Sequence, residues 1–425
     1  MTVQTQAISH RSMVIATFST IAEWYDFTLY LYLATVLSRV FFASSETSLL
    51  TALGGFAIAY LMRPIGAIVF GHIGDRYGRR RTMLMSMALM TAAMLATALL
   101  PTETQIGSAA GALLILSRCV MGFSVGGEYT SVVAYLLEGA PQSRRGLMTS
   151  VAAAASEIGA LLAAGISALT VSLLSEEALV TWGWRIPFLI GAALAGSILI
   201  ARSQMEESPD FEAQLKRGSV PKRPLHYALR HHRKGIARGF AISALGSITY
   251  YVGITYVPVY LSSVGELSEA RALWLATAAA VAVILVTPMV GALSDRIGRK
   301  PVLITLAIAS TLLPIAVFTL LSGASFANAL AGGILLAAVA GGVSAVGAVT
   351  TAEQFPGEAR LSGLAFGATA ATAVFGGLTP YIAQLLLMKT DWQPVPGALI
   401  AIVAVCVLPI LMTMPETRPR SVKVS

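Results

Sequence analysis

The feature that most constrains this chain is a succession of long apolar segments separated by short polar breaks. Hydrophobic residues make up 56% of the 425 residues and charged residues only 12%. A soluble protein of this size could not cover so much apolar surface with so few charges. A helix crosses a bilayer with about 20 apolar residues, and roughly twelve such segments can be marked off. The sequence therefore predicts an all-α integral membrane protein with twelve transmembrane helices.

The boundaries of these helices follow from the polar breaks. The polar N-terminus lacks a short apolar run followed by small residues, so no removable signal peptide is expected. The predicted spans are 14–42, 49–73, 82–100, 107–138, 146–173, 183–202, 235–262, 271–293, 301–321, 326–352, 361–387 and 394–414.

Basic residues gather in every second break between the predicted helices. The formal charge of +8 therefore indicates membrane orientation and not nucleic-acid binding. Lysine and arginine are retained on the cytoplasmic side during insertion. Both termini are therefore expected in the cytoplasm, with the chain in a bacterial cytoplasmic or inner membrane. The basic breaks contain Arg76 to Arg81, Arg144, Arg145, Arg296 to Lys300 and Arg360, whereas the opposite breaks contain Glu46, Glu103, Glu176, Glu177, Glu266, Glu269 and Asp391.

A repeated stretch indicates an internal duplication. GHIGDRYGRRRT begins at residue 71 and GALSDRIGRKPV at residue 291, and each follows the second apolar segment of its half. A long polar break separates six predicted helices from six. We expect a helical bundle over 1–202, a cytoplasmic linker over 203–234 and a second bundle over 235–425. Duplicated halves with a binding site between them are typical of secondary transporters.

Several motifs resemble those of a known family. The pattern G-x-x-x-D-R-x-G-R-R is similar to the signature loop of the major facilitator superfamily, although the second copy has Lys300 and Pro301. EWYDF, RPIGA, RCVMGFSVGGEYT, WGWRIPF and FGGLTP together resemble the metabolite:proton symporter family, whose members carry citrate, 2-oxoglutarate, shikimate, or proline and betaine. The resemblance implies that the charged loops close the cytoplasmic side. The implied gating residues are Asp75, Arg76, Arg79, Asp295, Arg296 and Arg299.

Ionisable side chains inside the predicted helices are candidates for proton handling, because charges within a bilayer are costly and usually functional. They lie almost entirely in the first half: Glu23, Asp26, Arg63, Arg118, Glu128 and Glu157. Four carboxylates against two arginines leave an excess of negative charge, so at least one carboxyl should bind a proton near neutral pH. The predicted proton-coupling residues are Asp26, Glu23, Glu128 and Glu157, with Asp26 preferred. Asp26 could alternatively form a structural ion pair with Arg63 or Arg118.

The predicted substrate contacts combine arginine with aromatic and hydroxyl side chains. Arg118 lies on a stripe with Gly122 and Gly126, where glycines also permit close helix packing. In the second half, a helical spacing places four residues on one face, which could either line the cavity or pack against neighbouring helices. The predicted substrate-binding residues are Arg118, Arg63, Tyr129, Thr249, Tyr256 and Tyr260. Gly253 lies on the same helical face as the last three, whereas Tyr251 falls on another face.

We therefore expect a proton-coupled importer of a small carboxylate-bearing metabolite, preferably a di- or tricarboxylate organic acid. A proline- or betaine-type zwitterion is the alternative. A drug:proton exporter is less expected, because exporters of the superfamily typically carry a proline-containing motif in the fifth helix and residues 150–165 contain no proline. A membrane sensor is also less expected, because the sequence shows no signalling domain. The sequence presents no nucleophile–base or metal-ligand constellation, so neither an enzyme nor a cofactor is expected. The expected partners are the solute, protons and the bilayer, with the chain a monomer that binds no nucleic acid.

Overall fold

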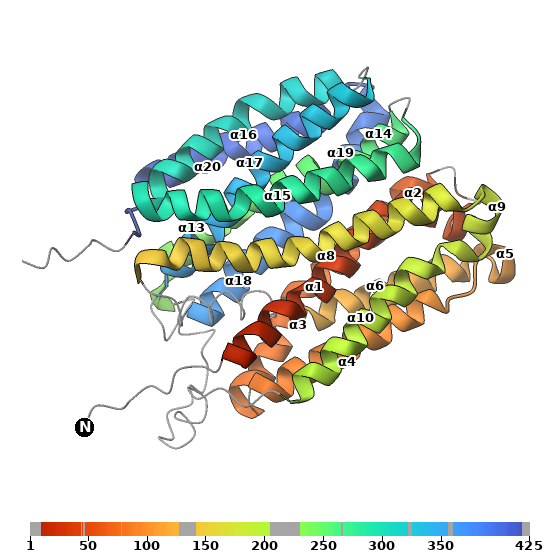
Figure 1. The fold of residues 1–425 in the computed structure, drawn as a ribbon, viewed down its shortest axis with the longest axis horizontal. Helices are drawn as coiled ribbons and strands as arrows, with labels where there is room; N and C mark the ends of the chain where they lie inside the picture. The colour runs from red at the N-terminus through yellow and green to blue at the C-terminus, as the bar shows by residue number, and fades with distance from the viewer. Residues whose placement is uncertain are drawn as a thin grey trace, which may run out of the picture.

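A computed structural model describes residues 10–43, 45, 47–77, 79–126, 142–204, 230–264, 267–321, 325–355 and 360–418. The elements of the described chain are helices that run along a common direction (Figure 1). Within these ranges, nine helices are long and apolar enough to cross a membrane, and one pair bent by 43° makes a tenth. This architecture confirms the predicted all-α membrane fold.

The helices of the first half begin and end close to the predicted breaks. They are α1 (His10–Tyr32), α2 (Ala34–Phe41), α3 (Ser48–Tyr77), α4 (Arg79–Ala98), α5 (Glu103–Ile106), α6 (Ala109–Ser124), the 3₁₀ turn η1 (Gln142–Arg144), α8 (Arg145–Leu173), α9 (Glu176–Ala178), the π turn η2 (Leu179–Gly183) and α10 (Arg185–Ser203).

The second half follows the same order of long helices and short breaks. Its elements are α13 (Arg233–Tyr250), the π turn η3 (Tyr251–Thr255), α14 (Val257–Ser263), α15 (Glu269–Ile297), α16 (Arg299–Leu321), α17 (Phe326–Glu353), α18 (Arg360–Thr372), the π turn η5 (Ala373–Leu378), α19 (Thr379–Thr390) and α20 (Val395–Thr413). If α1–α2, α13–α14 and α18–α19 each count as one span, the long helices give the twelve positions that the sequence predicts.

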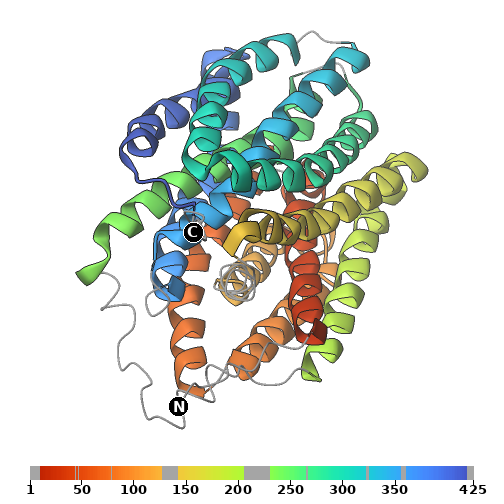
Figure 2. The same cartoon turned by 60° about the vertical axis from the view of Figure 1, so that its left-hand side comes forward.

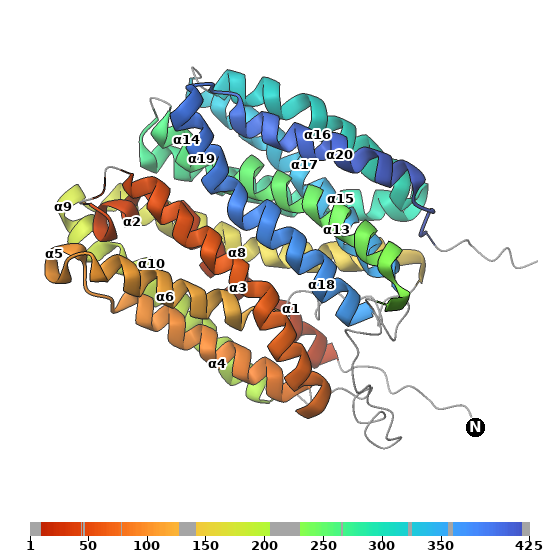
Figure 3. The ribbon, with the colours of Figure 1, turned by 180° about the vertical axis from the view of Figure 1, so that it is seen from behind.

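Helices of each half pack mainly on one another, and the two halves meet along two seams. The views in Figures 2 and 3 show the first half, red to yellow-green, lying beside the second half, green to blue. At one seam α8 runs along α15, and at the other α3 packs on α18, η5 and α19. A space between these seams is therefore walled by both halves.

Close packing inside the first half depends on glycine. A Cβ atom at Gly122 would lie 1.9 Å from the carbonyl oxygen of Ala59, and one at Gly126 would lie 2.2 Å from the backbone nitrogen of Ala67. Only a residue without a side chain permits α3 and the end of α6 to approach so closely. The stripe that continues from Arg118 thus serves helix packing.

Three π turns interrupt the long helices, and each contains the residue four positions before a proline. Those prolines are Pro187, Pro258 and Pro380. A proline has no N–H to donate to the carbonyl four residues earlier, so the α-helical bond cannot form there. In η3, the N–H of Tyr256 instead donates to the carbonyl of Tyr251 five residues back, at 2.9 Å. The wider turn accommodates one extra residue and rotates everything that follows it.

We call the end of the bundle where α3 ends and α4 begins the basic end (left in Figure 1). The helices α8, α13, α16 and α18 also begin there, and α20 ends there. The described arginines and lysines at this end include Arg80, Arg81, Arg144, Arg145, Arg202, Arg230, Arg233, Lys234, Arg296, Arg299, Lys300, Arg360 and Arg418. The other end is called the opposite end.

Candidate functional site

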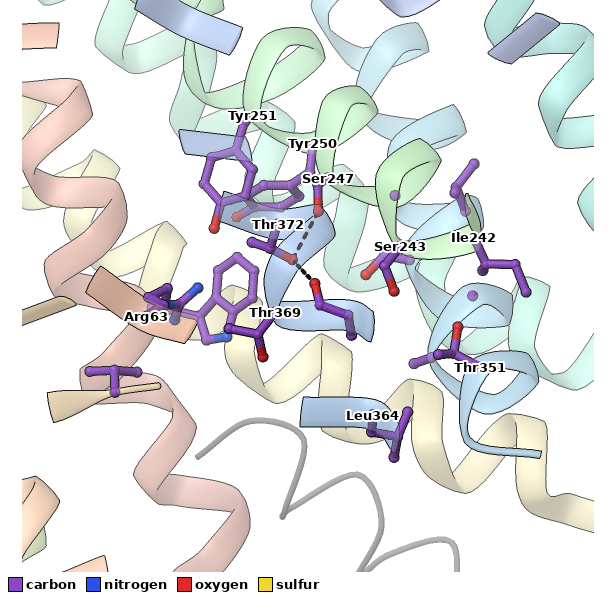
Figure 4. A pocket seen from close by; sticks show the side chains of 18 of the residues that line it. Arg63, Ile242, Ser243, Ser247, Tyr250, Tyr251, Thr351, Leu364, Thr369 and Thr372 are labelled. Carbon is purple, nitrogen blue, oxygen red and sulfur yellow. Dashed lines mark hydrogen bonds between the residues drawn. The ribbon is translucent and has the colours of Figure 1, made fainter. Parts of the chain in front are cut away.

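A cavity of about 150 Å³ lies between the two halves (Figure 4). The first half contributes residues of α1, α3 and the end of α6, and the second half contributes residues of α13, η3, α17 and α18. Its lining reaches Thr351 and Leu364, which lie close to helix ends at the basic end. The cavity therefore extends from the middle of the bundle toward the basic end.

The charged groups on the cavity wall come from the first half. Glu23 of α1 and Arg63 of α3 both line the cavity, and the Arg63 guanidinium donates a hydrogen bond to the Glu23 carboxylate. The guanidinium carbon of Arg63 also lies 4.2 Å from the ring centre of Phe27 and 4.9 Å from that of Tyr60. Ring faces attract a cation and hold it in place. The pair presents an oriented guanidinium and carboxylate with no net charge.

A second ion pair lies behind this wall, outside the cavity lining. Arg118 of α6 donates to Asp26 of α1 at 2.7 Å and to the hydroxyl of Thr97 at 2.7 Å. Both charged side chains are almost fully buried. Removing one member of such a pair strands a buried charge, so the two groups stabilise each other's ionised form. The pairing of Asp26 with Arg118 is the structural alternative that the sequence left open.

Glu157 of α8 is the third buried carboxyl of the described first half, and its environment differs from the other two. It accepts a hydrogen bond from the hydroxyl of Tyr250 in α13 at 3.2 Å, and no ion pair to it occurs among the described residues. Tyr250 itself lines the cavity. Glu157 thus contacts the cavity wall from behind and across the boundary between the halves.

Three aromatic rings form one side of the cavity. Trp24 of α1 meets Tyr250 edge to face with ring centres 5.1 Å apart, and its ring lies parallel to Tyr251 at 6.4 Å. Tyr251 also hydrogen-bonds Tyr60 of α3, with 2.6 Å between the hydroxyl oxygens. We call Trp24, Tyr250 and Tyr251 the aromatic wall. The Tyr60–Tyr251 bond joins the two halves on the side of the cavity away from the basic end.

The second half contributes a wall of hydroxyl groups. Ser247 of α13 donates to the hydroxyl of Thr372 in α18 at 3.0 Å, and Figure 4 shows this bond beside Thr369. Serine and threonine hydroxyls both donate and accept hydrogen bonds, so they can bind polar solutes without adding charge. The serines and threonines that line the cavity are Ser243, Ser247, Ser344, Thr351, Thr369 and Thr372.

The residues predicted to form the second-half wall do not line this cavity. Tyr256 donates to Gln384 at 2.6 Å, and Tyr260 donates to the carbonyls of Phe318 and Gln393. Thr249 borders a separate small space inside the second half. The face marked by residues 249 and 253 points away from the cavity, since the cavity-lining residues 243, 247, 250 and 251 occupy another face of the same helix, and beyond residue 253 the extra residue of η3 also shifts the register of Tyr256 and Tyr260.

The residues that the prediction missed carry a signal of their own. Ser243, Ser247, Tyr250 and Tyr251 follow the helical spacing i, i+4, i+7 and i+8, all before the π turn takes effect. The polar face of α13 could have been found by reading only as far as the residue before Gly253. Pro258 is the sequence signal that the pattern changes there.

A contact between the halves also forms at the basic end. The carboxylate of Asp295 in α15 accepts hydrogen bonds from the backbone N–H groups of Gly146 and Leu147 at 2.9 and 2.8 Å. These N–H groups belong to the first turn of α8, where an anion is favoured by the helix dipole. Arg299 holds Asp295 from the other side at 2.7 Å and lies 3.5 Å from Glu353. We call the Asp295 contact the basic-end latch.

The segment after α20 supports this latch. The carboxylate of Glu416 accepts hydrogen bonds from the backbone N–H groups of Arg299 and Lys300 at 2.9 and 3.0 Å. Partial burial opposes ionisation of Glu416, but the N–H donors of Arg418, Arg299 and Lys300, together with the charge of Arg299, hold its pKa below the usual range. The preceding Gly298 has a φ of 110°, a backbone conformation that side chains disfavour.

The opposite end has an ionic contact between the halves as well. Arg39 of α2 donates through both terminal nitrogens to Glu269 of α15 at 2.6 and 2.9 Å. It also lies 2.9 Å from Glu176. Two parallel bonds from a guanidinium to a carboxylate are the stronger form of an ion pair. We call the Arg39–Glu269 pair the opposite-end latch.

Some predicted residues fall outside what the structure describes. These are Glu128 and Tyr129, and the side chains of Asp75, Arg76 and Arg79. Arg296 is described, and its carbonyl accepts a hydrogen bond from Arg418. Among the described residues, no three His, Cys, Asp or Glu side chains gather closely enough to hold a metal ion.

Comparison with known proteins identifies the family. A family model described as Sugar (and other) transporter matches residues 12–219, and one described as Major Facilitator Superfamily matches residues 265–425. The Proline/betaine transporter of Salmonella typhimurium is 32% identical over 424 residues, covering 97% of this chain and 85% of that protein. The chain belongs to the metabolite:proton symporter family of the major facilitator superfamily. It is a multi-pass membrane protein whose family and fold are those of transporters.

Relatives within this family differ in the solutes that their names give. The Alpha-ketoglutarate permease of Escherichia coli is 33% identical over 379 residues, covering 88% of this chain and 87% of that protein. Among solved structures, the xylose transporter XylE from E. coli in a partially occluded inward-open conformation matches with a TM-score of 0.75. That match covers 97% of this chain and 99% of XylE at 22% identity, and it indicates the shared fold alone.

Proposed function

We propose that the protein is a symporter that imports a small carboxylate-bearing metabolite together with protons, by alternating access of a site between its two halves. The observation that carries the proposal is the cavity between the halves: the oriented guanidinium of Arg63 lines it, and the buried carboxyl of Glu157 lies behind its wall, bonded to Tyr250. A carrier needs a solute site at that boundary, because rocking of two halves exposes only the boundary to each side in turn.

The orientation follows from the distribution of charge. We propose that the basic end faces the cytoplasm of a bacterial cell, with both termini there and the chain in the cytoplasmic membrane. The boundaries 1–202, 203–234 and 235–425 remain our proposal for the two bundles and the linker. Asp295, Arg299 and Arg296, with Asp75, Arg76 and Arg79, are proposed to control opening of this end, and no catalytic activity is part of the proposal.

Arg63 is the proposed carboxylate-binding group, because it lines the cavity, whereas Arg118 is already bound to Asp26 and Thr97. Glu23 offsets the charge of Arg63, so the described lining has no excess of positive charge. A di- or tricarboxylate would add two or three negative charges that the described lining does not balance, and uncompensated charge is unfavourable in a low dielectric. This balance supports a zwitterion over the organic acid that the sequence favoured.

The aromatic wall supports the same choice. A quaternary ammonium group interacts favourably with the faces of Trp and Tyr rings. Trp24, Tyr250 and Tyr251 lie next to the Glu23–Arg63 pair on the same cavity. A solute with an ammonium group and a carboxylate a few atoms apart would match both parts. Relatives named as proline/betaine transporters add to this support.

The test is counterflow in proteoliposomes, where only a carrier exchanges internal for external solute. Radiolabelled glycine betaine, proline, 2-oxoglutarate and citrate would be compared, with external pH recorded on addition of each. We expect exchange of the two zwitterions and alkalinisation of the medium when they enter.

If 2-oxoglutarate or citrate exchanged and the two zwitterions did not, the substrate would be an organic acid, as the sequence favoured. A lack of exchange for all four would contradict the import proposal and favour the exporter or sensor alternatives. Glu128, Tyr129, Thr249, Tyr256 and Tyr260 stay predictions, and variants of each in the same assay would test their contact with the solute.

A further inference from the structure

Glu157 is a buried carboxyl in the middle of α8 for which the described residues supply no cationic partner. Its exposed fraction is 4%, and within the described residues its hydrogen bond comes from the neutral hydroxyl of Tyr250 at 3.2 Å. Glu23 and Asp26 are equally buried, but each is bound to an arginine. Of the three buried carboxyls of the described first half, Glu157 is therefore the one whose negative charge is not compensated.

In the described part of the chain, the elements around α8 do not supply a cation from another direction. Tyr32 of α1, Tyr250 of α13 and Tyr251 of η3 are the titratable groups in electrostatic contact with Glu157. Helices α10, α15 and α17 also pack on α8. The described charges of α8, α10, α15 and α17, apart from Glu157, lie in their first or last turns: Arg145, Arg185, Arg202, Glu269, Arg271, Asp295, Arg296 and Glu353.

Distance makes these end charges ineffective. Glu157 lies twelve residues after Arg145, the first residue of α8, which is about 18 Å along a helix. The two carboxylates of α1 near it, Glu23 and Asp26, are engaged with Arg63 and Arg118 and would repel a third anion. A carboxylate so placed has lost its hydration without gaining a counter-charge, and the protonated acid is the stable form.

We propose that Glu157 is the carboxyl that carries the coupled proton and that Tyr250 connects it to the solute cavity. This inference rests on the proposed function as a proton-coupled symporter. A proton from the outer side adds to a Glu157 carboxylate oxygen, forming one O–H bond, and leaves as a proton on the inner side, so no other reactant is consumed. Asp26 and Arg118 then have a positioning role, because each holds the other in its ionised form.

Tyr250 can transmit the protonation state because it contacts both sites. When Glu157 is ionised, the Tyr250 hydroxyl donates a hydrogen bond to the carboxylate, as in the 3.2 Å contact. When Glu157 is protonated, its own O–H can donate to the tyrosine oxygen, and the Tyr250 proton becomes available to a solute carboxylate. Binding of proton and solute would therefore favour each other, and the coupling is necessarily reciprocal.

The first experiment needs no solute. Infrared spectra of the purified full-length protein would record the C=O stretch of protonated carboxyl groups while the pH is raised from neutral. We expect a band at neutral pH that Glu157→Gln removes and that Asp26→Asn and Glu23→Gln preserve. Tyr250→Phe should shift the band without removing it, which keeps the test informative if Glu157→Gln fails to fold. Persistence of the band in a folded Glu157→Gln protein would overturn the proposal.

The second experiment measures coupling in proteoliposomes with radiolabelled glycine betaine as the probe. Glu157→Gln should retain measurable counterflow, since exchange moves no net proton, but should lose accumulation driven by a pH gradient. Tyr250→Phe should shift the pH dependence of glycine betaine uptake relative to the wild type. Gradient-driven accumulation by Glu157→Gln at the wild-type level would overturn this inference alone. Absence of counterflow in the wild type would instead overturn the symport proposal, and the coupling role with it.

Discussion

Trp24 is the aromatic residue that the described first half contributes to the cavity, and it contacts Tyr250 and Tyr251 of the second half. A cation over an indole face gains about 0.5–2 kcal/mol. Trp24→Ala should therefore raise the KM for glycine betaine about 2- to 30-fold. Trp24→Phe keeps a ring face and is the matched control, for which we expect a smaller increase. Equal KM values for the alanine variant and the wild type would remove the aromatic wall from solute binding.

The Asp26–Arg118 pair gives a prediction about stability. Both groups are buried, and breaking a buried pair by removing one partner costs about 3–5 kcal/mol. Asp26→Asn should lower the free energy of unfolding by this amount, and Arg118→Met in the same chain should restore much of it. Denaturant unfolding of the purified variants measures the difference. If the double variant were as unstable as the single one, the pair would not be the source of the loss.

Individual residues show where sequence reasoning worked and where it stopped. Buried Glu23, Asp26, Arg63 and Arg118 could be found from the sequence, because charges inside apolar segments are rare and therefore conspicuous. Which arginine pairs with which carboxylate could not, because the choice depends on how α1, α3 and α6 pack. Glu157 was also among the predicted proton-coupling residues, but its difference from Asp26 was hidden, since it follows from the lack of a nearby cation within the described fold.

At the scale of elements, the π turn η3 sets the direction of α14 relative to α13, which carries cavity-lining residues. Pro258→Ala supplies the missing N–H, so the carbonyl of Ile254 can form its α-helical bond and the 43° bend at this position should relax. We expect thermal stability to rise and the rate of glycine betaine uptake to fall several-fold.

The control for this change is Pro314→Ala. Pro314 lies inside α16, whose described residues contain no π turn. Its replacement should leave uptake near the wild-type rate. Similar transport losses in both proline variants would show that the effect comes from helix stability in general and not from the register of η3.

Element boundaries were predictable because the apolar runs are long and the breaks are polar. The expected spans 301–321 and 326–352 correspond to Arg299–Leu321 and Phe326–Glu353. The π turns were not predicted, because an α-helical period was assumed throughout. The sequence also marked the wrong face of this helix: residues 243, 247, 250 and 251 line the cavity. Tyr256 and Tyr260, which were expected on the cavity, instead bond inside the second half.

At the scale of the whole molecule, the two latches bind the halves together at opposite ends. Asp295→Asn weakens the basic-end latch, and Arg39→Gln weakens the opposite-end latch. Hydrogen bonds to charged groups contribute about 1.5–3 kcal/mol, which corresponds to a change of roughly 10- to 150-fold in the balance between open states. We expect the two variants to shift that balance in opposite directions.

Labelling of a single cysteine measures this balance. With Cys119 and Cys406 replaced by serine, Ser344→Cys on the cavity wall would be reacted with a water-soluble maleimide in inside-out and right-side-out vesicles. Asp295→Asn should speed labelling from the basic end, and Arg39→Gln should speed it from the opposite end. A change in the same direction for both would mean that the latches stabilise the fold and not a particular state.

The unequal composition of the cavity has a consequence for how such proteins diversify. Its ionic groups come from the first half, whereas its hydroxyls come from the second. Substitutions along α13, α17 and α18 can therefore alter solute preference while leaving the arginine–carboxylate pairs intact. Selection for a new nutrient can act on one half of the gene, and chimaeras that exchange second halves between relatives offer a direct route to carriers with redesigned specificity.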